Sequence, residues 1–308
     1  MYGLIIIGGG PAGVAAGIYA ARKKIKTLLI IESFGGQSLT SADVQNWIGT
    51  KSVSGYDLAK MLEDHLKAQE DAEILEGSLA TKIEKIEKGF RVTTSDGKTY
   101  DTITILLTSG SSRRKLGVPG EKELDGKGVV YCTICDAPIF KNKVVAVVGG
   151  GNSALEGVVD LIPYATDIYL MTRSELRGDP ITQEKVKASP KVKILTMNRV
   201  KEILGVQTGK VTGIKYEDKE GNEQELKLDG VFVEIGSVPN SGIARELVEI
   251  NPQGEVVVDH KTQRSSLLGI WAAGDVSDVL YKQNNISAGD AVKAVLNIYD
   301  YLHKSNQM

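Results

Sequence analysis

The sequence is poor in the residues that build metal centres and disulfide frameworks. Its 308 residues include two cysteines and three histidines, and His65, His260 and His303 show no ligand spacing. A structural zinc site needs about four such ligands, so we expect no metal site. A framework of structural disulfides would need several cysteine pairs. Two cysteines alone are typical of a protein from a reducing compartment.

An excess of one charge and long apolar runs are also missing. Lysine and arginine number 37 against 39 aspartates and glutamates, a formal net charge of −2. This balance provides no basic surface for nucleic acid or for an acidic membrane. No apolar run approaches the roughly 18–20 residues that cross a bilayer, and the chain starts on an apolar segment without the charged lead of a signal peptide. We therefore expect a soluble, cytoplasmic protein.

Glycine-rich turns, by contrast, stand in a recognisable pattern near the start of the chain. A short apolar strand over residues 4–7 leads into GGGPAG at residues 8–13 and an alanine-rich helix over residues 14–22. A second apolar strand, residues 27–31, ends on Glu32. Such glycines let backbone amides approach a pyrophosphate, and the acid can accept hydrogen bonds from a ribose. The pattern therefore predicts a dinucleotide site.

The same plan returns in the second half of the chain. An apolar strand over residues 144–148 precedes GGGNSA at residues 149–154, followed by a helix over residues 154–162 and a strand over residues 167–172. Short alternating strands follow each βαβ unit, over residues 72–107 and 193–228, and each half ends in an apolar strand that runs into a glycine turn. This duplication predicts two nucleotide folds, and therefore two bound nucleotides.

The predicted fold class is α/β, with two Rossmann-like nucleotide-binding domains of the three-layer ββα type. Each domain would carry a small antiparallel meander. The C-terminal part offers only a strand over residues 270–275 and a helix over residues 286–303, too little for a core of its own. We therefore expect a discontinuous first domain of residues 1–112 and 241–308. Residues 113–240 would form the second domain and carry both cysteines.

The two cysteines lie two residues apart in CTICD, residues 132–136, between the two glycine motifs. A zinc site, a structural staple and a redox dithiol are the competing interpretations. A zinc site lacks further ligands, and a disulfide that closes so small a loop would stabilise little. The redox interpretation is favoured, because one thiolate can exchange with a partner and the other with an electron source. Asp136 could carry the proton of that exchange, although turn and cap aspartates occupy similar positions.

Laid side by side, these motifs resemble those of the low-molecular-weight thioredoxin reductases, which are FAD-dependent pyridine nucleotide-disulphide oxidoreductases. The resemblance covers essentially the whole chain and includes Gly236–Asn240 and Ala272–Asp275. It implies electron transfer from a reduced nicotinamide nucleotide through FAD and the dithiol to the disulfide of thioredoxin or a thioredoxin-like protein. Cys135 would face the flavin, Cys132 would attack the partner, and Asp136 would act as acid or base. The family also implies a homodimer whose nucleotide domain rotates.

The resemblance transfers two sets of binding residues to this sequence. FAD would be held by Gly8, Gly10, Pro11, Ala12, Gly13, Glu32, Gly36, Gln37, Asn46, Gly110, Gly274, Asp275, Lys282 and Gln283. NADP would be held by Gly149, Gly151, Asn152, Ser153, Ala154, Arg173 and Arg177. The family's clamp for the 2′-phosphate is commonly His-Arg-Arg followed by another arginine, whereas residues 172–177 read TRSELR. We expect NADPH as the donor, with NADH or a non-nicotinamide donor as the alternative.

Other functions of the same fold remain open at this point. A dithiol oxidase would pass electrons from a thiol through flavin to oxygen, and the intact turn at residues 149–154 argues against it. Flavoproteins that reduce peroxiredoxins carry an additional N-terminal redox domain, and this chain begins at the first nucleotide strand, so we do not expect that class. A flavin-binding sensor or scaffold would not need an acid-flanked dithiol between two nucleotide folds.

Overall fold

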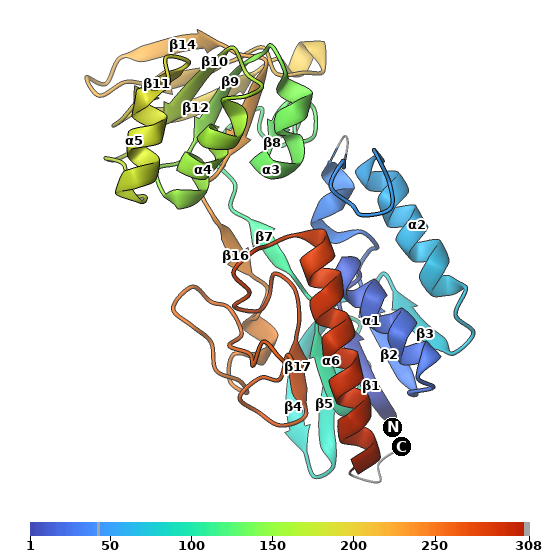
Figure 1. The fold of residues 1–308 in the computed structure, drawn as a ribbon. Coiled ribbons are helices and arrows are strands. Elements are labelled where there is room, and N and C mark those ends of the chain that lie inside the picture. Colours follow the sequence, from blue (N-terminus) through green and yellow to red (C-terminus); the bar gives the residue numbers. More distant parts are fainter. Residues whose placement is uncertain (42–43, 305–308) are drawn as a thin grey trace. The chain divides into compact units, whose positions relative to one another are not determined.

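The structure is a computed structural model that describes residues 1–41 and 44–304 (Figure 1). The chain divides into two compact units. Unit 1 contains Met1–Leu39, Trp47–Ser112 and Val238–Met308, and unit 2 contains Thr40–Asn46 and Arg113–Ser237. The two connecting segments, β7 (Ser111–Arg113) and β16 (Ser237–Pro239), pair as a two-stranded sheet. The return to unit 1 thus begins at Val238, where the sequence suggested residue 241.

Unit 1 is built on a seven-stranded sheet of order β3-β2-β1-β6-β5-β4, in which β17 also pairs with β6. The parallel strands are β1 (Tyr2–Ile7), β2 (Thr27–Ile31), β3 (Ala72–Glu76), β6 (Thr99–Leu107) and β17 (Ile270–Ala272). The antiparallel strands β4 (Ala80–Ile86) and β5 (Gly89–Thr94) extend the sheet from the first part of β6. Strand β6 therefore belongs to both the parallel sheet and the meander.

Successive side chains of β1 point to opposite faces of this sheet. Leu4 and Ile6 pack with helices α1 (Pro11–Arg22) and α6 (Asn284–Lys304), and Leu66 of α2 (Gly55–Lys67) joins the same core. Ile5 and Ile7 point to the opposite face, where side chains of β4 and β5 cover them. Because successive strand residues face opposite sides, a strand apolar at every position lies buried between two layers.

Unit 2 repeats this layering with two separate sheets. The parallel sheet has the order β11-β10-β9-β15-β8 and the antiparallel sheet the order β12-β13-β14. Their strands are β8 (Val129–Val130), β9 (Val144–Val148), β10 (Asp167–Met171), β11 (Val192–Leu195), β12 (Arg199–Leu204), β13 (Gly213–Glu217), β14 (Glu223–Lys227) and β15 (Gly230–Val233). The helices are α3 (Thr133–Asp136), α4 (Asn152–Leu161) and α5 (Pro180–Ala188). Short 3₁₀ turns lie at Gly36–Thr40, Ala137–Phe140, Val206–Thr208 and Gly242–Ala244.

The core of unit 2 is again split by a central strand. Val145 and Val147 of β9 pack with α4 and α5, and Ala146 and Val148 pack with the antiparallel sheet. Two elements differ from the sequence expectation. Residues 193–197 were placed in the meander, but β11 pairs parallel with β10 at the sheet edge. Helix α5 was not expected, although Asp179 caps it and Pro180 opens it, which are ordinary start signals.

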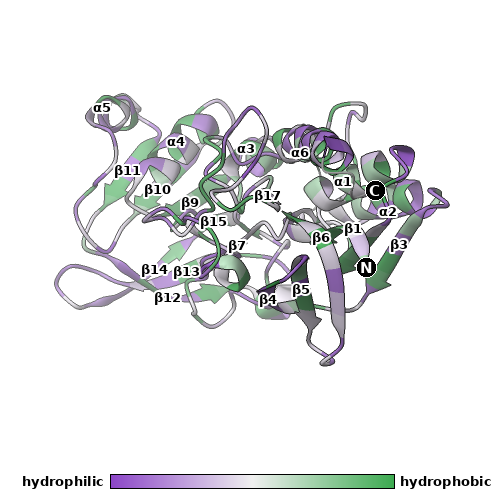
Figure 2. Cartoon of the chain, turned by 90° about the horizontal axis from the view of Figure 1, so that it is seen from below, coloured by the Kyte–Doolittle hydropathy of each residue, from purple (hydrophilic) through white to green (hydrophobic). Residues whose placement is uncertain are grey.

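Both units therefore contain a helix layer, a parallel sheet and an antiparallel meander, which confirms the prediction of two Rossmann-like units. In Figure 2 the parallel strands are predominantly coloured as hydrophobic, whereas α2 and α5 carry both colours. This matches sheets buried on both faces and helices with one face in solvent. Among the described residues, no helix is long and apolar enough to cross a membrane.

Candidate functional site

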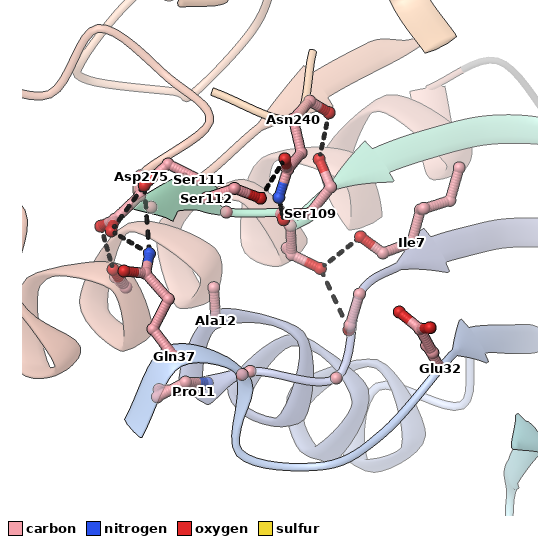
Figure 3. Close-up of a pocket in the computed structure, with 18 of the residues that line it drawn as sticks. Ile7, Pro11, Ala12, Glu32, Gln37, Ser109, Ser111, Ser112, Asn240 and Asp275 are labelled. Carbon is pink, nitrogen blue, oxygen red and sulfur yellow. Dashed lines mark hydrogen bonds between the residues drawn. The ribbon is translucent and has the colours of Figure 1, made fainter. Parts of the chain in front are cut away.

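A cavity of about 740 Å³ opens in unit 1 at the carboxyl ends of β1, β2, β6 and β17 (Figure 3). Open α/β sheets bind ligands at this edge, because the glycine-rich turns and helix N-termini gather there. The residues expected to bind FAD that line the cavity are Gly8, Gly10, Pro11, Ala12, Glu32, Gly36, Gln37, Gly110, Gly274 and Asp275. The first glycine motif thus forms one wall of a ligand-sized space.

Two glycines of this motif have different structural tasks. Gly13 lies in the first turn of α1, where a Cβ would come 1.8 Å from the carbonyl oxygen of Gly8. It is therefore required for close contact between the helix and the preceding turn. Gly10 is the N-cap of α1, and a Cβ there would meet only the Cα of Gly36, at 3.9 Å. Gly10 leaves open the path by which an anion reaches the first amides of the helix.

Polar side chains from distant parts of unit 1 meet on another wall. The Nε2 of Gln37 donates to the hydroxyl of Ser111 at 3.1 Å and to Oδ2 of Asp275 at 3.3 Å (Figure 3). The hydroxyls of Ser111 and Ser287 donate to the same carboxylate, at 3.4 Å and 3.5 Å. Asp275 is thereby fixed in the turn that follows β17. Glu32 lies at the end of β2 and lines the cavity without such restraints from neighbours.

Four of the residues expected at FAD do not line this cavity: Gly13, Asn46, Lys282 and Gln283. Lys282 instead forms an ion pair with Glu255 at 2.8 Å and donates to the carbonyl oxygens of Asp275 and Ser277, at 3.4 Å and 2.5 Å. It therefore supports the loop that carries Asp275. Lining residues that the sequence analysis did not single out include Ser78, Ala80, Ser109, Ser112, Asn240 and Asn284. Asn240 directly follows β16, whereas Ser78 and Ser109 lie in loops, Ala80 and Ser112 within strands, and Asn284 at the start of α6, so they share no local sequence signal.

The residues of this cavity fit a dinucleotide such as FAD. The first-turn amides of α1 are donors for phosphate oxygens, and no acidic residue in that turn repels an anion. A Cβ at Gly10 would stand in the space that a phosphate needs. The carboxylate of Glu32 is available for ribose hydroxyls at the end of the second strand.

The cysteine pair lies in unit 2, on a short helix after β8. Cys132 and Cys135 form a disulfide with their Cα atoms 5.3 Å apart. Cys132 is the N-cap of α3, and Asp136, 3% exposed, is its last residue. Both cysteines are partly exposed, and Ile134 between them is 61% exposed. The pair is therefore accessible at the surface of unit 2, while the neighbouring acid is buried.

A second buried acid, Glu234, contacts this helix and was not singled out in the sequence. It follows β15 and its Oε1 accepts hydrogen bonds from the backbone N–H of Thr133 at 3.1 Å and from the Thr133 hydroxyl at 2.6 Å. Burial raises the pKa of Glu234, and this effect exceeds the lowering by Thr133 and by the Arg113 guanidinium. The pKa of the half-buried Asp160 on α4 is raised by burial and by Glu156.

The second glycine motif opens α4 in unit 2. Gly149 has a φ of +156°, and a Cβ there would come 2.3 Å from the carbonyl oxygen of Glu234, whereas a Cβ at Gly151 would meet nothing within 4 Å. Ser153 and Ala154 lie in the first turn of the helix. The side chain of Asn152 accepts the backbone N–H of Asp179 at 2.7 Å. Gly151 therefore leaves a path to the helix N-terminus, as Gly10 does in unit 1.

The residues expected to select the nucleotide lie after β10. Thr172 is buried, and its Oγ1 would be 2.4 Å from a Cβ at Gly150. Arg173 and Arg177 are both exposed, and neither side chain forms an ion pair or hydrogen bond with another described residue. The backbone N–H of Arg177 donates to the carbonyl oxygen of Gly150 at 2.8 Å, which holds this loop on the glycine turn. Both guanidinium groups thus stay available for an anion.

Metal chemistry has no visible support in the described part of the chain. Residues 1–41 and 44–304 contain no group of three or more histidine, cysteine, aspartate or glutamate side chains placed to hold a metal ion.

Comparison with known proteins places these features in context. The family model described as "Pyridine nucleotide-disulphide oxidoreductase" matches residues 2–293. Among solved structures, thioredoxin reductase from Streptococcus pyogenes MGAS5005 has a TM-score of 0.91 and 33% identity, with 99% of each chain covered. Thioredoxin reductase from Giardia duodenalis has a TM-score of 0.89 and 31% identity, with 98% of this chain and 99% of that chain covered.

The curated relatives carry a different name. The F subunit of alkyl hydroperoxide reductase from Pseudomonas putida is 40% identical over 309 residues, and its counterpart from Staphylococcus epidermidis is 41% identical over 303 residues. These matches cover 99% and 98% of this chain but 59% of each relative. The chain thus spans less than two thirds of the length of these relatives.

Proposed function

Because the chain belongs to the pyridine nucleotide-disulphide oxidoreductase family, we propose that it is an FAD-dependent reductase of a thioredoxin-like protein, with a reduced nicotinamide nucleotide as electron donor. The observation that carries this proposal is the surface disulfide of Cys132 and Cys135 in a unit that also presents an open glycine turn. Unit 1 supplies a cavity suited to FAD. FAD, when bound, accepts two electrons from the nucleotide and passes them to a disulfide.

Within unit 1, the proposed task of the residues is to hold this cofactor. The first-turn amides of α1 bind the pyrophosphate, and Gly10 and Gly36 keep the approach open. Glu32 binds the ribose at the end of β2. Gln37 and the hydroxyls of Ser111 and Ser287 hold Asp275 in place, so that the turn after β17 lines the cavity.

Within unit 2, the dithiol delivers the electrons in two exchange steps. The thiolate of Cys132 attacks one sulfur of the partner's disulfide, forms a mixed disulfide and releases one partner thiolate. The thiolate of Cys135 then attacks the sulfur of Cys132, which restores the internal disulfide and releases the second partner thiolate. Each released thiolate takes up one proton. Asp136 is one residue from Cys135 and is the group we assign to the movement of protons at this pair.

The proposed electron donor is NADPH, and the argument depends on two exposed arginines. Strand β10 is followed by Thr172 rather than by an acid that would bind a ribose 2′-hydroxyl. Arg173 and Arg177 follow it with uncommitted guanidinium groups. A hydrogen bond to a charged group contributes about 1.5–3 kcal/mol, so one arginine favours the 2′-phosphate by roughly 10- to 150-fold.

Steady-state kinetics with both nucleotides tests this assignment. Arg173→Ala is expected to raise KM for NADPH by roughly 10- to 150-fold and to leave KM for NADH almost unchanged. Arg199→Ala, an exposed arginine on β12 in the same unit, is the matched control and should change neither constant. Equal use of both nucleotides by the unmutated protein would contradict a 2′-phosphate site at these arginines.

A second candidate partner follows from the curated relatives. They are named as a subunit of an alkyl hydroperoxide reductase and share 40% and 41% identity with this chain, so a peroxide-reducing partner protein is the alternative to a thioredoxin-like one. The expectation against that class depended on where the chain begins. It carries no weight, since the relatives match over only 59% of their own length.

One set of anaerobic titrations separates the candidate functions. Flavin bleaching is followed while NADPH, NADH or a reduced thiol is added, and reoxidation is then followed with thioredoxin, with a peroxiredoxin or with oxygen. The proposal expects bleaching by NADPH and fast reoxidation by one of the two proteins. Bleaching by the thiol and fast reoxidation by oxygen alone would instead show a dithiol oxidase. Size-exclusion chromatography with light scattering tests the proposed homodimer.

A further inference from the structure

We propose that Glu234 is a positioning residue of the cysteine pair, which holds the first turn of α3 through Thr133 and opposes the thiolate of Cys132 with its carboxylate charge. The inference deepens the proposed function and rests on the redox role assigned there to the pair. It assigns to Glu234 the control of how readily the disulfide accepts electrons.

The first step of the argument is the geometry of the contact. Glu234 is 8% exposed and Thr133 is 4% exposed, so water competes little for their hydrogen bonds. One carboxylate oxygen accepts both the backbone N–H of Thr133, at 3.1 Å, and its hydroxyl, at 2.6 Å. Cys132 is the N-cap of α3, so this N–H belongs to the first residue of the helix. Glu234 thus binds the turn on which the cysteine pair stands.

Packing on both sides keeps the pair of residues in place. Gly157 of α4 faces Thr133, and a Cβ at Gly157 would come 2.5 Å from the threonine hydroxyl oxygen. The backbone of Glu234 is held by the N–H that it donates to the carbonyl oxygen of Val148, at 2.9 Å. The turn after Cys132 therefore contacts a fixed helix and a fixed acid, and cannot shift without breaking one of these contacts.

The second step is the charge. Free N–H groups at a helix start stabilise a thiolate and lower the pKa of a cysteine there. Glu234 occupies the first of these N–H groups and, when ionised, places a negative charge beside the turn. Burial disfavours the ionised form of Glu234 most; of the charged groups that act on it, Arg113 favours that form and Asp160 disfavours it, while Glu156 acts on Asp160.

An ionised Glu234 therefore raises the pKa of the Cys132 thiol and destabilises the reduced pair. At a pH above the pKa of Cys132, reduction adds two electrons and one proton to the disulfide and gives the Cys132 thiolate and the Cys135 thiol, so a penalty on the thiolate favours the disulfide. The pair then gives up electrons more readily to a partner's disulfide. A neutral residue at position 234 would keep the turn in place and remove this penalty.

The test compares the holoenzyme with Glu234→Gln, which preserves an oxygen acceptor for Thr133 and removes the charge. The first measurement is the pH dependence of Cys132 alkylation by iodoacetamide in the reduced protein. The second is the dithiol–disulfide equilibrium in glutathione buffers, read by mass spectrometry. We expect the alkylation midpoint to fall by about one pH unit and the equilibrium to shift about tenfold towards the dithiol, which is about 30 mV for a two-electron couple.

Asp229→Asn is the matched control. Asp229 precedes β15, at the opposite end of the strand from Glu234, and its carboxylate also accepts a backbone N–H, that of Val144 at 2.9 Å. This variant is expected to leave both measurements unchanged. Equal shifts in the two variants would show a general loss of charge rather than a local effect, and would overturn the inference.

A second variant protects the test against misfolding. Thr133→Val removes the hydroxyl donor but keeps the charge of Glu234, so its alkylation midpoint should stay closer to the unmutated protein than that of Glu234→Gln. A folded Glu234→Gln protein with an unchanged midpoint and an unchanged equilibrium would refute the inference. Failure of both nucleotides to reduce the pair in every variant would instead refute the proposed function, because the glutathione measurements do not depend on the nucleotide.

Discussion

Gly10 and Gly13 of the first glycine motif allow effects on FAD binding to be distinguished from effects on folding. Replacing either one with alanine adds a single methyl group, at a different place in the structure. In Gly13→Ala the new Cβ would lie 1.8 Å from the carbonyl oxygen of Gly8, far inside a normal contact. The obstacle is backbone and not the end of a flexible side chain, so the helix or the turn must move. Overpacking of this kind costs typically 1–3 kcal/mol. Replacing a helical glycine with alanine returns about 0.5–1 kcal/mol, so at the upper end of the overpacking range, which a clash with backbone favours, the net loss is roughly 2 kcal/mol.

Gly10→Ala should behave in the opposite way. Its Cβ would have a nearest neighbour at 3.9 Å, and the φ of −76° at Gly10 suits alanine. The free energy of unfolding of the FAD-free protein should therefore stay within about 0.5 kcal/mol of the original, as for ordinary surface changes. The methyl group would stand where a phosphate approaches the helix amides. Loss of one charge-assisted hydrogen bond costs about 1.5–3 kcal/mol, a roughly 10- to 150-fold weaker affinity for FAD.

Two measurements on the FAD-free proteins decide between these effects. Thermal unfolding followed by circular dichroism should show a Tm lower by roughly 4–8 °C for Gly13→Ala and almost unchanged for Gly10→Ala. Titration with FAD, followed by quenching of flavin fluorescence, should show the large loss of affinity in Gly10→Ala. If Gly13→Ala melts with the unmutated protein, or if Gly10→Ala binds FAD normally, the tasks assigned to the two glycines are wrong.

Three further predictions concern other parts of the proposed sites. Glu32→Ala should weaken FAD binding by about 1.5–3 kcal/mol, measured by the same fluorescence titration, and an unchanged affinity would exclude a bond from Glu32 to the ribose. If Cys135 faces the flavin, Cys132→Ser should show a long-wavelength charge-transfer band that Cys135→Ser lacks; the reverse pattern would exchange their roles. Because the pKa of Glu234 is raised from 4.5, its contribution to stability is present below that value and is lost as pH rises through the raised pKa. As pH rises above 4.5, the free energy of unfolding of Glu234→Gln, measured by urea unfolding, should therefore fall less than that of the unmutated protein. Parallel curves of this free energy against pH would contradict the assignment.

The layers of the fold and the first glycine wall could be predicted because their signals are local. A strand apolar at every position, a glycine turn and a helix follow one another within about twenty residues, and each signal concerns neighbouring positions. The same holds for the repeat in unit 2, where residues 149–154 again open a helix. Each half of the chain also supported the interpretation of the other half, because two copies of the same strand, glycine turn and helix pattern seldom arise from turn chemistry alone.

The parts that escaped prediction depend on contacts between distant residues. Glu234 and Thr133 are 101 positions apart, and no local pattern distinguishes this glutamate from an exposed one after a strand. Lys282 was placed at the flavin by resemblance, and its ion pair with Glu255 under the loop that bears Asp275 was not predicted. Edge strand β11 has an apolar pattern that suits either sheet, so its pairing with β10 was decided by tertiary contacts.

The paired segments β7 and β16 also bear on how the protein is made. Unit 2 is inserted between two halves of unit 1, and its entry and exit lie side by side in one small sheet. During synthesis the inserted unit can complete its core while unit 1 still lacks β17 and α6, which pair with β6 and pack on α1. The N-terminal part of unit 1, residues 1–112, is therefore synthesised well before the strand and helix that complete its packing. We expect chaperone binding to the nascent chain to be strongest in that interval and to end when residues 270–304 leave the exit tunnel.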